Sequence, residues 1–494
     1  MELKTEGYRL HKSSPLFLFI EAIKKSVIPL AIGIIGTSGD RQDFIILAIA
    51  TVASIMTIIQ FWFYHYWLEE DRLVVKEGIL FKSLRQIPYE RIQNLNIEKN
   101  PLHKLFKVAT LQVESASGVK PEAVIRVIAD QQVKFIQQTI KNKGISIHAD
   151  NGQPVGVPIN QVSTNSLYKM SNKDVATFGF ISHKALVPIG IVFSILSQND
   201  YYRDKFIGFM QKFVGDLHVE LWGWSEWLLY GITFGIMTML VIWLSSIGLA
   251  FLKLYQFTLN KEHKNLHAEM GLLTKITANI PIKRIQLIKI KHSPLHRYFR
   301  KVSIKMETAG GVTEQSGITM NWIAPLVSRV RGQQVISQIQ PEVDWSKIQW
   351  KNLEQRAWKR IFKKIMLVIL LAMVPLLYFY QWVGILPLSL APIAFYYAKA
   401  YIAHAGYAVN KQVIAYRRGV FFHTISVVKI AKIQNISYMQ TPFDRRNQMA
   451  RITVDTAGSN PVTQDIDLHY LDKKKVLKIQ EFLATEVSQS QFVW

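Results

Sequence analysis

A run of basic side chains between positions 289 and 301 is the densest group of residues in this chain that could bind a ligand. The run surrounds a predicted turn at the end of a strand, and it consists of Lys289, Lys291, His292, His296, Arg297, Arg300 and Lys301. Several cations on one loop attract an anionic membrane surface by roughly 1 kcal/mol for each residue near it. We therefore predict a contact with anionic lipid through Lys289, Lys291, Arg297, Arg300 and Lys301.

A solvated surface and a nucleic-acid contact are two other interpretations of this basic run. A solvated basic surface explains it equally well, because one side of a membrane protein carries an excess of Lys and Arg. Nucleic acid would also meet a basic loop, but no aromatic stacking platform accompanies this one. The choice between a lipid contact and a solvated surface therefore stays open, and nucleic acid is not an expected partner.

A short motif that occurs three times supplies a second set of candidate residues. In the first copy, Arg91-Ile92-Gln93, the alternation of a strand places Arg91 and Gln93 on one face. These two side chains could contact a phosphate or a peptide. However, an Arg or Gln beside a tight turn commonly satisfies backbone groups. We therefore interpret the motif as structural in all three copies, which hold Arg91, Gln93, Arg284, Gln286, Lys432 and Gln434.

No motif typical of an enzyme accompanies these residues. His263 and His267 are four positions apart, but they lie in a predicted hairpin and lack the glutamate of a zinc-protease motif. The chain has no cysteine, which excludes disulfides, thiolate nucleophiles and Cys-ligated metals. A Gly-rich phosphate loop and a nucleophile elbow are also missing from the sequence. We predict a protein that is not an enzyme, with no catalytic residue, cofactor or metal site.

The composition indicates a membrane protein with basic flanks. The chain has 494 residues, a formal net charge of +24 and an apolar fraction of 49%. Uncharged apolar runs near 20 residues are long enough to span a bilayer as helices. Six such runs occur as three pairs: about 16–36 and 43–64, 178–197 and 227–252, and 362–381 and 383–402. An interfacial helix over Leu16–Ile23 is an alternative start for the first run.

The distribution of Lys and Arg predicts the orientation of these hairpins. The proposed outer loops, about 37–42, 198–226 and 381–384, hold four such residues. The opposite flanks are richer in them, and the positive flanks of spanning helices face the cytosol. Each pair is a hairpin, so we expect the segments between the pairs to emerge on the cytosolic side of the cell membrane.

These emerging segments are three copies of one unit. A shift of 193 residues superposes Gly78 on Gly271 without a gap, and a shift of 341 superposes Gly78 on Gly419. The predicted organisation is hairpin 1 (1–66), domain 1 (67–148), a linker (149–170), hairpin 2 (171–253), domain 2 (254–340), an interfacial helix with hairpin 3 (341–402), and domain 3 (403–487).

Each repeated unit alternates apolar and polar residues, which predicts a curved antiparallel sheet of about seven strands. Helical spacing of apolar residues then predicts a helix at the end of each unit, over 130–143, about 321–338 and 471–485. Residues 344–364 are interpreted as an amphipathic entry helix at the lipid surface, with a solvated connector as the alternative.

The repeated motifs resemble those of bacterial pleckstrin-homology-like (PH-like) membrane proteins of the YdbT type. The residues that carry the resemblance are Glu77-Gly78, Ile87-Pro88, Arg91-Ile92-Gln93 and Asn100-Pro101-Leu102, with their later counterparts. The resemblance implies an α+β membrane protein in which six transmembrane helices form three hairpins, each followed by a PH-like sheet with a C-terminal helix. It also implies cytosolic domains and a smaller PH-like relative as partner, but no known reaction or ligand.

The function predicted from these features is a non-enzymatic membrane scaffold that acts in envelope maintenance. Open sheet edges invite pairing with another strand, so the three domains could cover one another or take up a related domain. The alternative is a transporter or export component whose six helices form a substrate path. Against this alternative, the central parts of the predicted spans carry almost no ionisable residues, which ion and proton pathways need.

Overall fold

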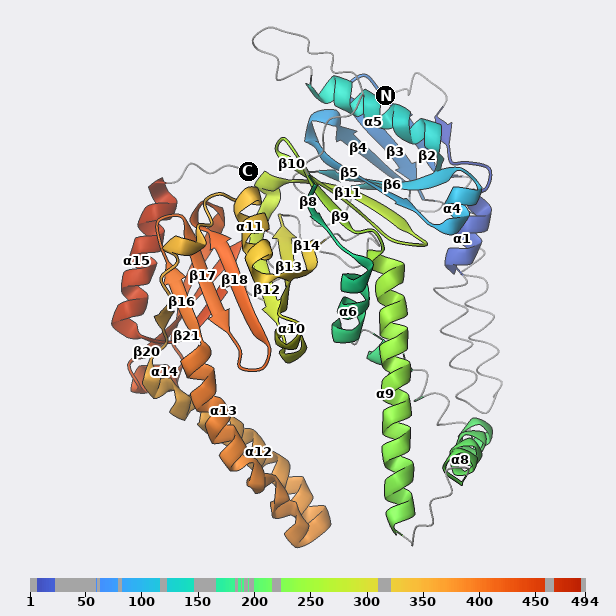
Figure 1. The fold of residues 1–494 in the computed structure, drawn as a ribbon. Coiled ribbons are helices and arrows are strands. Elements are labelled where there is room, and N and C mark those ends of the chain that lie inside the picture. The colour runs from blue at the N-terminus through green and yellow to red at the C-terminus, as the bar shows by residue number, and fades with distance from the viewer. Residues whose placement is uncertain are drawn as a thin grey trace. The chain divides into compact units, whose positions relative to one another are not determined.

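The computed structural model describes residues 7–22, 59, 63–78, 82–115, 122–145, 166–182, 185–187, 189–190, 194, 200–215, 224–309, 321–457 and 466–489. The chain divides into two compact units (Figure 1). The first holds Met1–Ser163, Lys169–Thr258 and Ala268–Asn279, and the second holds Thr164–Tyr168, Leu259–His267 and Ile280–Trp494.

The first repeat shows the order of elements that the other two follow. Three strands, a 3-10 turn and a fourth strand lead to a short helix, two further strands and a long helix. The bounds are β2 His65–Leu68, β3 Arg72–Glu77, β4 Ser83–Pro88, η2 Tyr89–Arg91, β5 Ile92–Lys99, α4 Pro101–Leu105, β6 Val108–Ser115, β7 Ala123–Ala129 and α5 Asp130–Ile145. Before them lie β1 Tyr8–Arg9 and α1 Ser14–Ala22.

The second and third repeats have the same elements. Those of the second are β9 Thr258–Glu262, β10 Asn265–Met270, β11 Lys275–Pro281, η3 Ile282–Arg284, β12 Ile285–His292, α10 Pro294–Tyr298, β13 Lys301–Thr308, β14 Trp322–Ser328 and α11 Arg329–Ile339. Those of the third are β16 Gly406–Val409, β17 Val413–Arg418, β18 His423–Lys429, η8 Ile430–Lys432, β19 Ile433–Met439, α14 Pro442–Arg446, β20 Met449–Thr456, β21 Ile466–Asp472 and α15 Lys473–Gln489.

Two local features, a glycine with positive φ and a capped short helix, explain why the repeated motifs fold alike. Gly78, Gly271 and Gly419 have φ values of 102°, 111° and 100°, which L side chains rarely adopt, and each ends the second strand of its repeat. Before each short helix, Asn100, Ser293 or Thr441 forms a capping box with the residue three positions later, and a proline begins the helix. These positions account for the glycine and proline signals of the sequence.

The strands of one repeat do not form a single sheet, contrary to the prediction of one sheet with about seven strands. In the first unit, β1-β2-β3-β4 make one sheet, while β7-β6-β5 belong to another that continues into β11 of the second repeat. In the second unit, one sheet has the order β14-β13-β12-β18-β17-β16-β15, and a smaller one is β19-β20-β21. The second half of each of the first two repeats therefore shares a sheet with the first half of the next.

The two joints between repeats have the same register. At the first joint, Lys275 lies opposite Lys99 and Thr277 opposite Ile97. At the second joint, His423 lies opposite His292, and the pairing continues to Val428 opposite Leu287. A shift of 193 residues carries Lys99 to His292, and a shift of 148 residues (341 − 193) carries Lys275 to His423, so the first set of pairs superposes on the second. One edge-to-edge interface is therefore used twice.

Three helices among the described residues are long and apolar enough to cross a membrane. They contain Gly231–Leu254, Gln355–Phe379 and Gln381–His404, and they belong to α9 (Trp224–Leu254), α12 (Trp358–Tyr380) and the pair η7 (Gln381–Leu390) and α13 (Ala391–His404). The first matches the predicted span 227–252. The other two match the third predicted hairpin, and α12 packs beside α13 (Figure 1).

The remaining predicted spans fall largely outside the described residues. Of 16–36 the structure describes the part that lies in α1 (Ser14–Ala22), and of 43–64 it describes residues 59, 63 and 64. Of 178–197 it describes the end of α6 (Asn172–Ser182) and a few further residues. Gly179 of α6 lies against the backbone of Ile247 in α9, so a larger side chain would collide there. The close packing of α6 on α9 agrees with a second hairpin. The loop between them contains the helix α8 (Asp200–Gly215).

Three other predictions need correction. Residues 344–364 are not one helix: they contain η5 (Trp345–Lys347), β15 (Lys351–Asn352), η6 (Gln355–Ala357) and the start of α12. Asp344 caps η5 through its side chain, and β15 pairs with β16, which removes this segment from a continuous helix. The helix expected at 321–338 begins at Arg329, because 322–328 form β14. The predicted linker ends in a strand, β8 (Ser166–Lys169).

Candidate anion-binding site

A pocket of about 490 Å³ lies in the second unit, where the sheet shared by repeats two and three faces α11. This volume is typical of sites for small molecules. Its walls come from β12, β13 and α11 of the second repeat, from β17 and β18 of the third, and from the connector between them. The lining residues are Ile290, His292, Arg297, Val302, Ile304, Arg329, Gly332, Gln333, Trp345, Ile348, Trp350, Arg417, His423 and Ile425.

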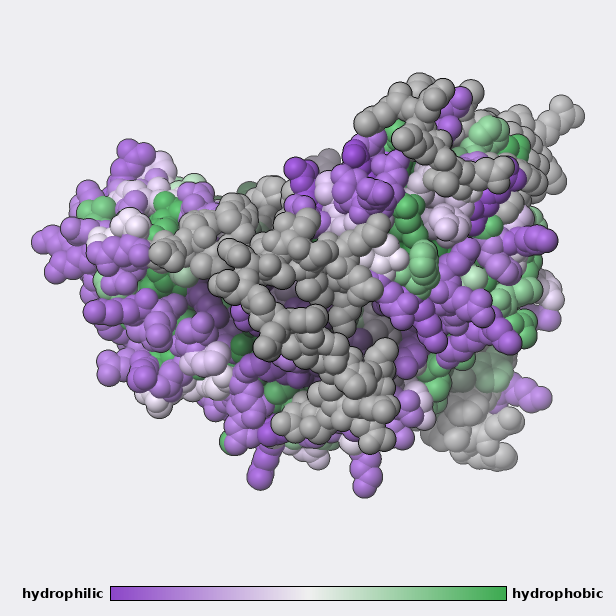
Figure 2. Space-filling view, turned by 90° about the horizontal axis from the view of Figure 1, so that it is seen from above, coloured by the Kyte–Doolittle hydropathy of each residue, from purple (hydrophilic) through white to green (hydrophobic). Residues whose placement is uncertain are grey.

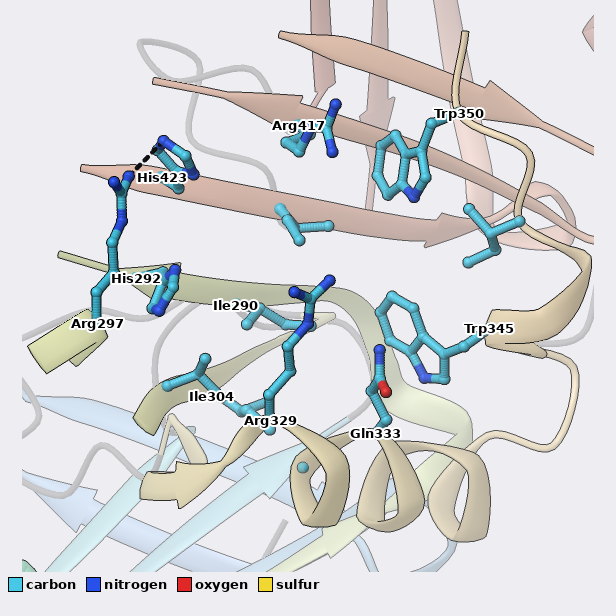
Figure 3. Close-up of a pocket in the computed structure, with 14 residues that line it drawn as sticks. Ile290, His292, Arg297, Ile304, Arg329, Gln333, Trp345, Trp350, Arg417 and His423 are labelled. Atoms are coloured by element: carbon cyan, nitrogen blue, oxygen red, sulfur yellow. Dashed lines mark hydrogen bonds between the residues drawn. The ribbon is translucent and has the colours of Figure 1, made fainter. Parts of the chain in front are cut away.

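The polar side of the pocket is entirely cationic or imidazole, apart from one amide. Figure 3 shows Arg297, His292 and His423 at one end and two tryptophans at the other, with Arg329 and Arg417 between them. No carboxylate occurs among the fourteen residues that line it in the described part of the chain. In the described residues, none of the three arginines has an ion pair with a carboxylate.

Two of the three arginines are held in place by hydrogen bonds. Arg297 donates to the carbonyl oxygen of Val420 at 2.8 Å and contacts Nε2 of His423 at 2.6 Å. Arg417 donates from Nε to the carbonyl oxygen of His404 at 2.8 Å, and its guanidinium lies 5.1 Å from the ring centre of Trp350. These bonds fix the guanidinium groups and leave their positive charge uncompensated.

Burial and, after it, the neighbouring positive charges lower the pKa values of His292, His423 and Arg417. Burial, followed by the charges of Arg297 and His423, lowers the pKa of His292 below its ordinary value. The pKa of His423 is lowered in the same way by burial and by Arg297, and that of Arg417 by burial and by Arg329. At neutral pH the histidines are therefore uncharged, and the three arginines supply the charge of the site.

The rest of the wall is apolar and aromatic. Ile290, Val302, Ile304 and Ile348 line it together with the two indole rings. The indole N–H of Trp345 is buried and has no hydrogen-bond acceptor among the described residues. A buried donor without a partner costs about 1–3 kcal/mol. The site thus offers unmatched positive charge beside an apolar surface, which suits an anion with an apolar portion.

The predicted basic run is divided by the structure. Arg297 lines the pocket, whereas Lys289 forms an ion pair of 2.6 Å with Glu307 and is half-buried. Lys291 is exposed at its place in β12 opposite Thr424, Arg300 is exposed in the turn after α10, and Lys301 begins β13. The five residues therefore do not converge on one point, and their contact with lipid stays a prediction.

The Arg-X-Gln motif has a different local structure from the one expected. Arg91, Arg284 and Lys432 each end a 3-10 turn and so precede the strand instead of sharing a face of it with the glutamine. In each of the three strands that follow, the register shifts across the glutamine that is its second residue, namely Gln93, Gln286 and Gln434. Bulges of this kind bend a strand where pairing must change.

The buried Arg284 supports the structural interpretation of this motif. Its guanidinium donates to the carbonyl oxygen of Ala309 at 2.9 Å, and the N–H of Ala309 donates back to the carbonyl oxygen of Arg284 at 2.8 Å. The arginine thereby closes the end of β13. In the described chain no group of three His, Asp or Glu side chains could hold a metal ion. His263 lies in the turn before β10 and His267 within β10.

Comparison with known proteins agrees with this repeated architecture. The sequence model of the family described as "Bacterial PH domain" matches residues 16–144, 213–343 and 365–487. The chain belongs to the bacterial PH domain family. It is also 23% identical over 483 residues to the "UPF0699 transmembrane protein YdbT" of Bacillus subtilis (strain 168), across 93% of this chain and 94% of that protein. No solved structure matches the chain.

Sequence reasoning missed most of the pocket between the second and third bacterial PH domains, including two arginines and two tryptophans. Arg329 and Arg417 are isolated cations in the sequence, and Trp345 and Trp350 were assigned to a lipid-surface helix that does not form. A signal was available in the repeats. Arg417 occupies the position that Glu269 has in the preceding repeat. Arg329 is the first residue of α11, and Asp130 is the first residue of α5, the equivalent helix of the first domain. Both changes exchange an acid for a base.

Proposed function

We propose that this membrane protein is a non-enzymatic scaffold of the cell membrane that binds further bacterial PH domains through its sheet edges. In this proposal six helices form three hairpins, and the three domains face the cytosol, where Lys and Arg flank the spans. A smaller single-domain relative in the same membrane would be such a partner. The assembly would serve envelope maintenance.

The observation that carries the proposal is the joint used twice with one register. The third strand of each later domain pairs with the fourth strand of the domain before it: β11 pairs with β5, and β18 pairs with β12. A further joint of this type, with another domain, needs a third or a fourth strand whose edge is unpaired. The chain carries one of each, because β4 (third strand of the first repeat) and β19 (fourth strand of the third repeat) end their sheets among the strands that the structure describes.

Exposure distinguishes the free edge β4 from its paired counterparts. Leu84 is 51% exposed, and Arg85 and Gln86 are also exposed. The residues equivalent to Arg85 are Ala278 and Ser426, which are only 2% and 4% exposed. An exposed edge presents backbone groups that invite another strand. A domain with the complementary edge would therefore bury β4 as β18 is buried.

The turns of the domains support a position against the leaflet. Leu272 and Leu273, after Gly271, are exposed, and the N–H of Leu272 donates to the carbonyl oxygen of Leu252 in α9 at 3.1 Å. Phe421 occupies the equivalent turn of the third domain and stacks on Tyr397 of α13. Apolar turns beside the ends of membrane helices suit insertion into the interface. The surface in Figure 2 is, by contrast, mostly hydrophilic among the described residues.

A cysteine cross-link tests the edge pairing with a second copy as the probe, because that copy carries both edges. The shared register would place Ser83 of one copy opposite Met439 of the other. Directly opposed residues are within disulfide reach, whereas diagonal neighbours about 7–8 Å apart are not. One tagged copy carries Ser83→Cys and a differently tagged copy carries Met439→Cys, and both are reconstituted into proteoliposomes and oxidised. The chain lacks native cysteine.

The expected product is a dimer that contains both tags, with few dimers of either copy alone. The matched control replaces Met439→Cys by Ser437→Cys, which is two positions out of register and should cross-link poorly. Equal amounts of all three dimers would mean random collision and would contradict the proposal. Absence of mixed dimers at high protein density would contradict it too.

A further inference from the structure

We propose that the pocket between the second and third domains binds the headgroup phosphate of an anionic phospholipid. The inference does not depend on the edge pairing above. It rests on a comparison of the two joints, on the position of the pocket beside a membrane helix, and on the mixed chemistry of its walls.

At the first joint, the cations at the positions equivalent to the pocket are compensated by carboxylates. Lys99 and Lys275 lie opposite each other there, at the positions of His292 and His423. Lys99 forms an ion pair of 2.7 Å with Asp130, and Lys275 forms one of 2.8 Å with Glu269. Each cation of the first joint thus has its own carboxylate.

The second joint has lost both of these carboxylates. Arg329 begins α11 as Asp130 begins α5, and Arg417 stands at the position of Glu269 in the second strand of its repeat. Among the described residues, no acid replaces them in the lining. The chain can compensate this position internally, as the first joint demonstrates. At the second joint compensation must therefore come from an external anion.

The position of the pocket indicates the source of that anion. Arg417 is hydrogen-bonded to the backbone of His404, the last residue of the candidate span Gln381–His404. The rings of His404 and His423 lie 5.5 Å apart. The cationic end of the pocket is thus at the level where α13 leaves the membrane, which is the level of lipid headgroups. Basic pockets at the ends of membrane helices bind such headgroups.

The walls fit a lipid better than a free phosphate. Arginine forks bind phosphate oxygens through paired hydrogen bonds, and Arg329 and Arg417 face the pocket from opposite sides (Figure 3). Beside them, the indole rings of Trp345 and Trp350 and the isoleucine side chains form an apolar surface that a free phosphate would not use. Glycerol and the upper acyl chain of a phospholipid would cover it.

The test measures the unfolding temperature of the full-length chain in a neutral detergent at constant ionic strength. The probes are dihexanoyl phosphatidylglycerol, dihexanoyl phosphatidylcholine and inorganic phosphate. The variant Arg329→Asp with Arg417→Glu gives the second joint the acids of the first. A control, Lys474→Asp with Lys478→Glu, makes the same change of net charge at exposed positions of α15. Arg329→Ala alone serves if the double variant does not fold.

The wild-type chain and the control should be stabilised by phosphatidylglycerol and much less by the other two probes. The double variant should bind phosphatidylglycerol at least about tenfold more weakly, since each cation near anionic lipid contributes roughly 1 kcal/mol. Equal stabilisation by inorganic phosphate would overturn the lipid as ligand. An unchanged response of the pocket variants, or no response of the wild type, would overturn the site.

Discussion

Arg360, in the first turn of the candidate membrane-spanning helix α12, forms an ion pair with the buried carboxylate of Asp444 in the third domain. The same guanidinium donates to Oγ1 of Thr441 at 2.9 Å, so it contacts both members of a capping box. In the other two domains the position of Asp444 holds His103 or His296. This ion pair therefore links the third domain to α12, which is long and apolar enough to cross a membrane.

Replacement of Arg360 by Met should destabilise the third domain by about 3 kcal/mol, because it leaves a buried carboxylate unpaired. Adding Asp444→His should recover most of this loss, since a histidine completes the same capping box in the other domains. Unfolding of the four members of this double-mutant cycle in detergent measures the coupling. A cost below about 1 kcal/mol for Arg360→Met would mean that water reaches Asp444.

The capping histidines make stability depend on pH. Burial lowers the pKa of His103 and of His296 from 6.5 to about 4 in the folded chain. In the unfolded chain both would titrate near 6.5, so the unfolded state binds more protons between pH 6.5 and 4. Stability should therefore be complete above pH 6.5, fall as the pH decreases to about 4, and lose up to about 3 kcal/mol for each histidine.

A comparison of variants separates this effect from the titration of carboxylates. His103→Gln with His296→Gln keeps a hydrogen-bonding side chain at both positions but cannot take up a proton. Its unfolding temperature should fall less steeply between pH 6.5 and 5 than that of the wild type. Identical slopes would show that neither histidine is neutral and buried as described.

Local patterns in the sequence predicted the closing helices of the first and third domains. The apolar spacing of residues 130–143 and 471–485 predicted α5 and α15, which span Asp130–Ile145 and Lys473–Gln489. The apolar runs 362–381 and 383–402 correspond to two helices that are long and apolar enough to cross a membrane, Gln355–Phe379 and Gln381–His404. These features depend on periodicities within about 20 residues, which a sequence displays directly.

The joints could not be predicted in detail, because their partners are distant in the sequence. Lys289 lies opposite Ser426, and no local pattern relates these two positions. The same distance hides the pocket, whose cations come from α10, α11 and β17. The connector 344–364 was mistaken for a helix because its aromatic and basic residues suit a lipid surface. Its pairing with β16 overrides that local pattern.

The second joint limits what a deletion of the third domain can test. Removal of residues 405–487 would take away β18 and expose the edge of β12, where Leu287 and Ile288 are buried. It would also uncover Ile361 and Ala398 of the third hairpin, which pack in the core of the third domain. Substitutions at the free edges are therefore the better probes of assembly.

The orientation of the domains can be tested by thiol labelling, since the chain lacks cysteine. Cysteines at Ser117, Ser316 and Ser459 would follow the fifth strand of their respective repeats in the chain, and one at Ser197 would lie between α6 and α8. If the domains face the cytosol, a membrane-impermeant reagent should label Ser197→Cys in intact cells and leave the other three unlabelled. Labelling of any domain position before the cells are broken would contradict this orientation.

Hydrogen exchange offers a direct comparison of a joint strand with its free counterpart. β12 is paired with β13 on one side and β18 on the other, whereas β19 is paired with β20 alone among the described strands. Backbone amides alternate in direction along an antiparallel strand. In the dilute single chain, peptides covering β12 should therefore exchange slowly throughout, and those covering β19 should exchange about half of their amides rapidly.

Assembly should protect the rapidly exchanging amides of β19. At high density in proteoliposomes, an incoming β4 edge would supply acceptors to those N–H groups, while β12 would show no change. Protection should appear in β4 and β19 together, because one interface buries both edges. Protection of β19 without β4 would mean that a different surface covers this strand. Slow exchange of the whole of β19 already in the dilute chain would show that its edge is covered within the single chain and is not available to a partner.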